Sequence, residues 1–320
     1  MTPQPVVLVL RALGLGDLLA ALPALRALGD AFPGHRRLLV TDPALAPLVR
    51  LAGAAHHVVP SRDLRPLPGP LRPDVAVNLH GRGPESSRLL AALRPRRLVA
   101  FAHPDVGETA GGPRWLSQEH PSDEHEVERW CRLLWESGIP ADTDRLDLEV
   151  DAPFTGVTVV HPGAAYPARR WPPERWADVA RHESRSGRQV VVTGGPGEVE
   201  LASSVAAMAG LPPRAVRAGR TGVLDLARLV AGAGLVLCGD TGVAHLATAT
   251  RTPSVVLFGP TPPGLWGPPP DRPIHRALWA GRGGDPRGHR PDPGLLRITV
   301  ADVLAEIASA RARRSLAGSS

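Results

Sequence analysis

Residues 235–261, LVLCGDTGVAHLATATRTPSVVLFGPT, constrain the fold of this chain more than any other stretch. They predict a buried apolar strand, a turn of glycine and small polar residues, an alanine-rich helix and a second apolar strand. Such a unit points backbone N–H groups and the positive end of a helix dipole at one spot, which suits a phosphate or diphosphate. Asp240, Thr241 and His245 can converge there, because His245 lies one helical turn beyond the others. This turn is the first candidate ligand site.

The alternation of short apolar runs with helical stretches continues along the whole chain. Apolar strands are also expected at residues 6–10, 37–40, 75–79, 98–101, 157–160 and 189–193. Strands that alternate with helices predict parallel, doubly wound α/β sheets. A length of 320 residues exceeds one ordinary core and suits two domains of about 150 residues each.

The domain organisation follows from where the strand pattern restarts. We expect a first domain over residues 1–152 and a second over residues 153–298. A final amphipathic helix with a frayed tail is expected in residues 299–320. Residues 260–294 are rich in proline and glycine and predict surface loops with little regular structure.

Composition excludes several classes of function. A hydrophobic content of 43% with 21% charged residues is ordinary for a soluble globular protein. The formal net charge is +6, yet every basic side chain is an arginine and the arginines are scattered, without a nucleic-acid-binding motif. We therefore expect small anionic substrates, or an anionic membrane surface, and no nucleic-acid partner. Cys131 and Cys238 fit no disulfide framework, and no Cys/His cluster suggests a metal site.

The start of the chain predicts no membrane span and no secretion signal. Residues 6–10 form an apolar run far shorter than the about 20 residues that cross a bilayer. The cationic start and cleavage site of a signal peptide are also missing from this stretch. A cytoplasmic location is the simplest expectation.

Both halves contain an apolar strand followed by Gly-Asp at the start of a helix, and the first copy is Gly16-Asp17. Ligands bind beyond the carboxyl ends of parallel strands, so Asp17 and Asp240 would border one cleft if the domains face each other. Asp17 has two interpretations, a helix cap or a general base, and spacing alone favours the cap. A dinucleotide site is disfavoured, because Leu19 stands where the third small residue of G-x-G-x-x-G belongs.

Two further loops follow strands of the second half. The first contains Gly163, Ala164, Ala165 and Arg169, where small residues leave room for a ligand and an arginine could clamp a phosphate. A loop of solvated arginines is supported equally well. In the second loop, Glu198 is more simply a first-turn helix carboxylate, and the alternative is an acceptor for ribose hydroxyls.

Taken together, these motifs resemble the family 9 glycosyltransferases, the bacterial heptosyltransferases of lipopolysaccharide core assembly. The resemblance covers nearly the whole chain. It depends on an ordered set of motifs, which are Arg11-x-x-x-x-Gly16-Asp17, His161-Pro162-Gly163, Arg170-Trp171-Pro172, Gly194-Gly195-Pro196, Gly239-Asp240-Thr241-Gly242-x-x-His245 and Phe258-Gly259-Pro260-Thr261.

The resemblance implies a GT-B fold, in which two Rossmann-like, doubly wound parallel-sheet domains face a central cleft. The N-terminal domain would bind the acceptor and the C-terminal domain the nucleotide sugar, with the last helix packing back toward the N-terminal domain. It also implies an inverting transferase that moves a heptose, or a related sugar, from an ADP-sugar to a hydroxyl of a glycan or secondary metabolite. The ADP-sugar is a co-substrate, and neither a metal nor another cofactor is expected.

The resemblance also implies roles for particular residues. Asp17 would be the catalytic base, which reverses the preference for a cap. The implied donor site consists of Gly163, Ala164, Ala165, Arg169, Glu198, Thr221, Asp240, Thr241, Gly242 and His245. Gly16, Arg82 and Arg88 are the candidates for the acceptor site.

Three departures from the family pattern bear on the donor. Arg169 replaces the family's phosphate-binding lysine, and Ala164 and Ala165 lack the hydroxyls often found there. The cysteine-bearing segment of some members appears here, at residues 280–289, without cysteine. Two alternatives stay open, a GT-B transferase that uses a UDP-, GDP- or dTDP-sugar, and a nucleotide-sugar-binding homologue without activity. Peripheral association with the inner membrane surface is a further expectation.

Overall fold

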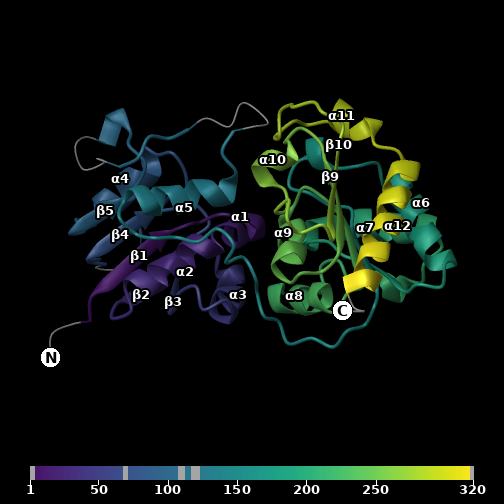
Figure 1. The fold of residues 1–320 in the computed structure, drawn as a ribbon, viewed down its shortest axis with the longest axis horizontal. Helices are drawn as coiled ribbons and strands as arrows, with labels where there is room; N and C mark the ends of the chain where they lie inside the picture. The colour runs from purple at the N-terminus through teal and green to yellow at the C-terminus, as the bar shows by residue number, and fades with distance from the viewer. Residues whose placement is uncertain (1–3, 68–70, 107–111, 117–122, 318–320) are drawn as a thin grey trace. The chain divides into compact units, whose positions relative to one another are not determined.

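The fold was analysed in a computed structural model that describes residues 4–67, 71–106, 112–116 and 123–317 (Figure 1). The chain divides into two compact units, Met1–Leu148 and Glu149–Ser320. Each unit contains one sheet of five parallel strands. The alternation of strands and helices in the sequence therefore produces the predicted α/β architecture twice.

The sheet of the first unit has the strand order β3-β2-β1-β4-β5. Its strands are β1 (Val6–Leu10), β2 (Arg36–Thr41), β3 (His57–Pro60), β4 (Val75–Asn78) and β5 (Arg97–Val99). Its α-helices are α1 (Leu15–Ala20), α2 (Leu22–Ala31), α3 (Ala46–Leu51), α4 (Glu85–Ala91) and α5 (Glu126–Glu136). The central strand β1 is buried almost along its whole length, as a parallel strand covered on both faces requires.

The sheet of the second unit has the strand order β10-β9-β8-β6-β7. Its strands are β6 (Thr158–His161), β7 (Val190–Val192), β8 (Leu235–Gly239), β9 (Ser254–Phe258) and β10 (His275–Trp279). Its α-helices are α6 (Pro173–Arg185), α7 (Val199–Ala209), α8 (Val223–Ala231), α9 (Gly242–Ala249), α10 (Pro263–Trp266), α11 (Pro293–Arg297) and α12 (Val300–Ala317). In Figure 1, α6, α7 and α12 lie on one side of this sheet, and α8 and α9 on the other.

The last helix packs on the second unit. Val303, Ile307 and Ala310 of α12 are buried in the same apolar cluster as Trp171 and Trp176. These contacts belong to the second unit, and the expectation that α12 also reaches the first domain stays a prediction.

A polar contact adds to this apolar packing. Glu183 of α6 is fully buried, and Arg311 of α12 and Thr158 of β6 both donate to its Oε2 atom. A buried carboxylate that pairs with an arginine from another helix fixes the register of α12 on α6.

The prediction of little regular structure in residues 260–294 was wrong. This stretch contains α10, the edge strand β10 and the first two residues of α11. Strand β10, His-Arg-Ala-Leu-Trp, pairs in parallel with β9 over its whole length. Among the described residues no further strand pairs with its outer edge, and His275 and Arg276 leave it without a continuous apolar run. The edge strand β3 escaped prediction because its apolar run consists of only Val58 and Val59.

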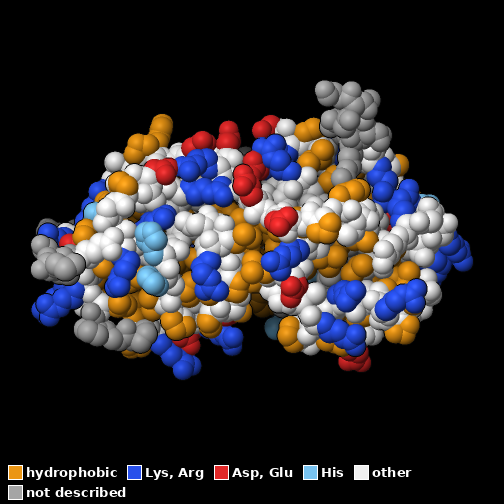
Figure 2. Space-filling view, turned by 90° about the horizontal axis from the view of Figure 1, so that it is seen from below, with side chains coloured by type: hydrophobic (Ala, Val, Ile, Leu, Met, Phe, Trp, Pro, Cys, Tyr) orange, Lys and Arg blue, Asp and Glu red, His pale blue; other side chains and the backbone are white. Residues whose placement is uncertain are grey.

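Two observations concern the charged surface and the hydropathy of the helices. On the face shown in Figure 2, arginines lie dispersed among apolar, neutral and acidic side chains. Among the described residues, no helix combines the length and hydropathy that crossing a bilayer requires.

Candidate functional site

In each sheet, the chain reverses its winding direction beside the first strand. In the first unit this switch point lies between β1 and β4, and in the second it lies between β6 and β8. Open parallel sheets bind ligands beyond the carboxyl ends of the strands at such a point. The loop after β1 carries Asp17, and the loops after β6 and β8 carry Arg169 and Asp240. The topology thus places these three side chains where a ligand site is expected.

Arg169 and Asp240 meet at the switch point of the second unit. Arg169 Nη1 lies 3.6 Å from Asp240 Oδ2, and the Asp240 side chain is only 6% exposed whereas that of Arg169 is 22% exposed. Gly239 permits this approach, since a Cβ there would come within 3.0 Å of the backbone oxygen of Arg169. The pair therefore presents a partly exposed guanidinium whose orientation is set by a buried carboxylate.

The start of α9 lies next to this pair. Thr241 is the N-cap residue, and its side chain makes no capping hydrogen bond to the helix. Gly242 opens the helix, and both residues are partly exposed. His245 lies one turn further on, with its ring 5.8 Å from that of Trp266 in an edge-to-face arrangement. Asp240, Thr241, Gly242 and His245 thus lie in the turn after β8 and the first turn of α9, as the sequence predicts.

Glu198 is held between the loops that follow β6 and β7. Its Oε2 accepts a 2.7 Å hydrogen bond from the backbone N–H of Gly195, and it lies 3.9 Å from His161 Nε2. Gly163 faces the same carboxylate so closely that a Cβ there would come within 2.1 Å of Glu198 Oε1. The hydrogen bond from Gly195 is the first-turn carboxylate contact that the sequence favours. The close approach of Gly163 also fixes the position of the Glu198 carboxylate.

His161, at the end of β6, is buried and supports this arrangement. Its Nδ1 lies 3.0 Å from the hydroxyl of Thr193. Burial lowers the pKa of His161 below its ordinary value, although the carboxylate of Glu198 opposes this. The imidazole is therefore neutral near pH 7, and it faces Glu198 across 3.9 Å as a dipole without a hydrogen bond.

The remaining donor-side positions are less closely joined. Ala164 is buried and its carbonyl accepts a 2.9 Å hydrogen bond from Arg170 Nε, so its methyl group packs inside the loop. Ala165 is exposed, and Thr221 is partly exposed in the loop that precedes α8.

Asp17 occupies the third position of α1. Its Oδ2 accepts a 3.2 Å hydrogen bond from the N–H of Gly14, the N-cap residue, which is the capping contact that spacing favoured. Its Oδ1 lies 3.5 Å from Arg11 Nη2. The side chain is nevertheless 29% exposed. Capping therefore orients the carboxylate without closing it off from a ligand.

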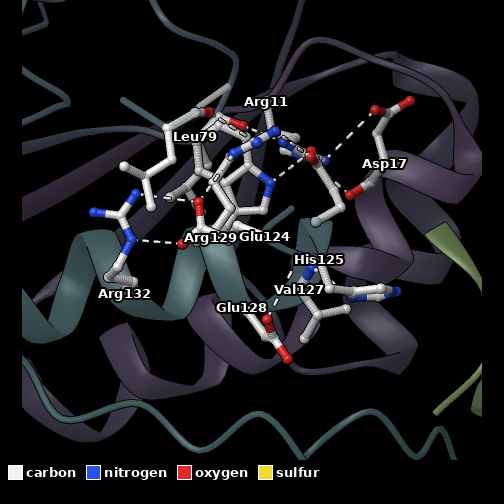
Figure 3. A network of polar contacts seen from close by, with 12 residues as sticks. Arg11, Asp17, Leu79, Glu124, His125, Val127, Glu128, Arg129 and Arg132 are labelled. Carbon is white, nitrogen blue, oxygen red and sulfur yellow. Dashed lines mark hydrogen bonds and ion pairs between the residues drawn. The ribbon is translucent and has the colours of Figure 1, made fainter. Parts of the chain in front are cut away.

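Figure 3 shows that Asp17 borders a buried network of charged side chains. Arg11 contacts Asp17, Glu126 and the carbonyl of Leu79, and Glu126 in turn accepts from Arg129. The network extends to Glu124 and Arg132. Sequence reasoning found Arg11 as part of a motif but missed Glu126, because a carboxylate at the start of a helix resembles an ordinary first-turn residue.

His80 is a second residue that the sequence analysis missed. It follows β4, on the other side of the switch point from Asp17. Its Nδ1 is buried and has no hydrogen-bond partner among the described residues. Burial and the charge of Arg11 lower its pKa, while Asp17 opposes them. The signal that could have found it is its position directly after a buried strand.

Of the three acceptor-site candidates, Gly16 is the sequence neighbour of Asp17. Among the described residues, no contact joins Arg82 or Arg88 to Asp17. Arg88 is exposed, and it donates a 3.2 Å hydrogen bond to the backbone oxygen of Asp105. Arg82 is exposed as well. Within the described ranges, no group of three or more His, Cys, Asp or Glu residues could hold a metal ion.

Two five-stranded parallel sheets with candidate sites at their switch points have the fold class of the GT-B glycosyltransferases. The solved structure of *E. coli* ADP-heptose lps heptosyltransferase II has a TM-score of 0.78 with this chain at 21% identity, and covers 97% of this chain and 99% of its own. The structure of *E. coli* heptosyltransferase WaaC with ADP has a TM-score of 0.70 at 22% identity, and covers 95% and 99%.

Sequence comparison extends this from fold to family. Residues 114–286 match the family model Glycosyltransferase family 9 (heptosyltransferase). Lipopolysaccharide heptosyltransferase 1 of *Pseudomonas aeruginosa* is 27% identical over 288 residues, which cover 82% of this chain and 80% of the relative. The chain belongs to glycosyltransferase family 9, and it is a heptosyltransferase-like glycosyltransferase.

Proposed function

We propose that this protein transfers a heptose, or a related sugar, from an ADP-sugar to a hydroxyl group of a glycan or secondary-metabolite acceptor, with inversion at the anomeric carbon. Its relatives support a sugar transfer of this type, since they are named as lipopolysaccharide heptosyltransferases. The named substrate of one solved fold neighbour, ADP-heptose, supports ADP as the nucleotide. In this proposal residues 1–152 bind the acceptor and residues 153–298 the donor.

The observation that carries the proposal is the pairing of Arg169 with Asp240 beside the uncapped start of α9. As the bond between the anomeric carbon and the diphosphate oxygen breaks, negative charge builds on the diphosphate. The guanidinium of Arg169 and the N–H groups at Thr241 and Gly242 stabilise that charge. We assign Glu198, Thr221, Gly163, Ala164, Ala165 and His245 to the surrounding donor site.

Asp17 is the proposed general base. It removes the proton of the acceptor hydroxyl while that oxygen forms its bond to the anomeric carbon, on the face opposite the diphosphate. The 29% exposure of its side chain and its orientation by Gly14 suit this role. No metal ion takes part in the proposed reaction, and we place the enzyme in the cytoplasm, in peripheral association with the inner membrane surface.

The first experiment is calorimetric titration of the protein with ADP, UDP, GDP and dTDP, without added metal. Preference for ADP supports the proposed donor, and preference for another nucleotide assigns a different one. Binding of none of the four contradicts a nucleotide-sugar site.

Turnover is then tested as ADP release from ADP-heptose in the presence of a lipopolysaccharide-core acceptor. The Asp17→Asn variant keeps the size of the side chain and the capping oxygen, and we expect it to bind ADP while losing at least about 100-fold in turnover. If Asp17→Asn instead changes only stability, the cap is the whole role of Asp17.

A further inference from the structure

Arg11 carries a charge that is completely buried next to Asp17. Its side chain is 0% exposed, and its guanidinium lies 4.7 Å from the centre of the Trp130 ring. Nε donates a 2.8 Å hydrogen bond to the backbone oxygen of Asp17, and Nη1 donates to the carbonyl of Leu79. Carbonyls and an aromatic ring cannot neutralise a cation, so a buried guanidinium needs a carboxylate partner.

Glu126 is the buried carboxylate that meets this need. Its side chain is 6% exposed, and its Oε1 lies 3.2 Å from Arg11 Nη2, closer than the 3.5 Å between the same nitrogen and Asp17 Oδ1. Trp130 Nε1 and Arg129 Nη1 donate hydrogen bonds of 2.8 and 3.0 Å to it, which hold it in place. Since Asp17 is the more exposed of the two carboxylates, water screens its attraction to Arg11 more strongly. Glu126 therefore takes the larger share of the charge of Arg11.

We infer that Glu126 is a positioning residue for Asp17. By neutralising Arg11, it lets the guanidinium orient the Asp17 carboxylate without weakening it as a base. This inference depends on the proposed function, because it assumes that Asp17 removes the proton. It depends on the contact between Arg11, directly after β1, and Glu126, on the first turn of α5, which stand 115 positions apart in the chain.

Among the charged and titratable groups around Asp17, Arg11 is the cation that acts directly on the Asp17 carboxylate. His80, on the loop after β4, feels the charges of both Arg11 and Asp17, but its pKa lies below the ordinary value, first through burial and then through Arg11. It is therefore neutral near pH 7 and above. Arg129 contacts Glu126 and lies one residue further from Asp17 in the network. Removing the charge of Glu126 would thus leave Arg11 as a bare cation facing Asp17.

The central test is the Glu126→Gln variant, assayed as turnover of ADP-heptose against pH. A cation at this range makes a carboxylate a weaker base by about one pH unit or more. We expect the acid-side midpoint of the profile to move to lower pH by about one unit, kcat at neutral pH to fall by up to about tenfold, and the donor KM to stay unchanged.

Glu124→Gln is the matched control. Its side chain is 8% exposed, so it loses a similarly buried negative charge, but its ion pairs are with Arg129 and Arg132. We expect a comparable loss of stability with no movement of the pH profile. A profile that moves equally in both variants would reduce Glu126 to a structural residue.

The double variant Arg11→Met/Glu126→Gln covers the case in which Glu126→Gln does not fold, because removing both charges avoids an unpaired buried cation. Its acid-side midpoint should lie at or above that of the unmodified protein, while kcat still falls because Asp17 has lost its orienting partner. A kcat in the double variant equal to that of the unmodified protein overturns the inference.

The Asp17→Asn variant separates the two levels of the argument. If it retains turnover, the proposed base is wrong whatever Glu126 does. If Asp17→Asn is inactive while the Glu126 variants leave kcat and the pH profile unchanged, only the positioning role fails.

Discussion

Replacing Gly163 by alanine should displace the carboxylate of Glu198 without removing its charge. A Cβ at position 163 would come within 2.1 Å of Glu198 Oε1, 2.3 Å of its Cδ and 2.6 Å of its Oε2. Ordinary van der Waals contact begins at 3.4 Å, so the carboxylate must retreat by about 1 Å. Its hydrogen bond from Gly195, now 2.7 Å, cannot survive that movement. The side chain is flexible, so the retreat adds little strain beyond the loss of that hydrogen bond.

The expected consequence is weaker nucleotide binding in a protein that still folds. A hydrogen bond to a charged group contributes about 1.5–3 kcal/mol, so moving Glu198 away from the ribose hydroxyls should raise the Kd for ADP by about 10- to 100-fold. Calorimetry with ADP measures this, and thermal unfolding checks that the variant is folded. Glu198→Gln is the matched control, since it keeps the position and loses the charge. An unchanged Kd in folded Gly163→Ala would refute the placement of Glu198 in the donor site.

Three other outcomes are expected. Arg169→Ala should raise the Kd for ADP by about 10-fold or more. Arg169→Lys should recover part of the affinity, because a lysine keeps the charge but not the bidentate geometry. Equal affinity for ADP in the unmodified protein and both variants would contradict the phosphate contact. Burial, with smaller contributions from two nearby arginines, lowers the pKa of His275 to about 4. Unfolding therefore takes up a proton as pH falls from about 6.5 to 4, and the free energy of unfolding declines by up to about 3 kcal/mol. The difference in this free energy between pH 7 and pH 4.5, measured by urea unfolding, should be smaller in His275→Gln, and an equal difference would count against the shift. Ile307→Ala should lose about 2–5 kcal/mol of unfolding free energy in urea, because it leaves a cavity between α12 and the sheet. The variant Ala308→Ser, at an exposed neighbouring position, should stay within about 0.5 kcal/mol of the unmodified protein. Similar losses in both variants would mean that α12 does not pack as described.

Much of the fold and part of the candidate site could be predicted from the sequence. The interior strands are buried on both faces, so β1, β8 and β9 appear as continuous apolar runs. The edge strands β3 and β10 were missed because their apolar runs are short: β3 has two valines between a histidine and a proline, and Arg276 interrupts β10. The edge strands β5 and β7 were predicted from their apolar runs. The turn after β8 was recognised because its glycines and small polar residues are neighbours in sequence.

The sequence by itself determined the local units of this protein: which segments form strands, which form helices, and where Gly-Asp turns join them. These features depend on contacts within a few residues, and apolar periodicity and capping preferences record them. Only the tertiary structure decided which side chains meet, because the strand order brings together loops that lie far apart in the chain. Arg169 reaches Asp240 over 71 positions, and Arg11 reaches Glu126 over 115. No local pattern encodes such a pair, since its energy depends on burial that exists only once the sheet and its helices have assembled.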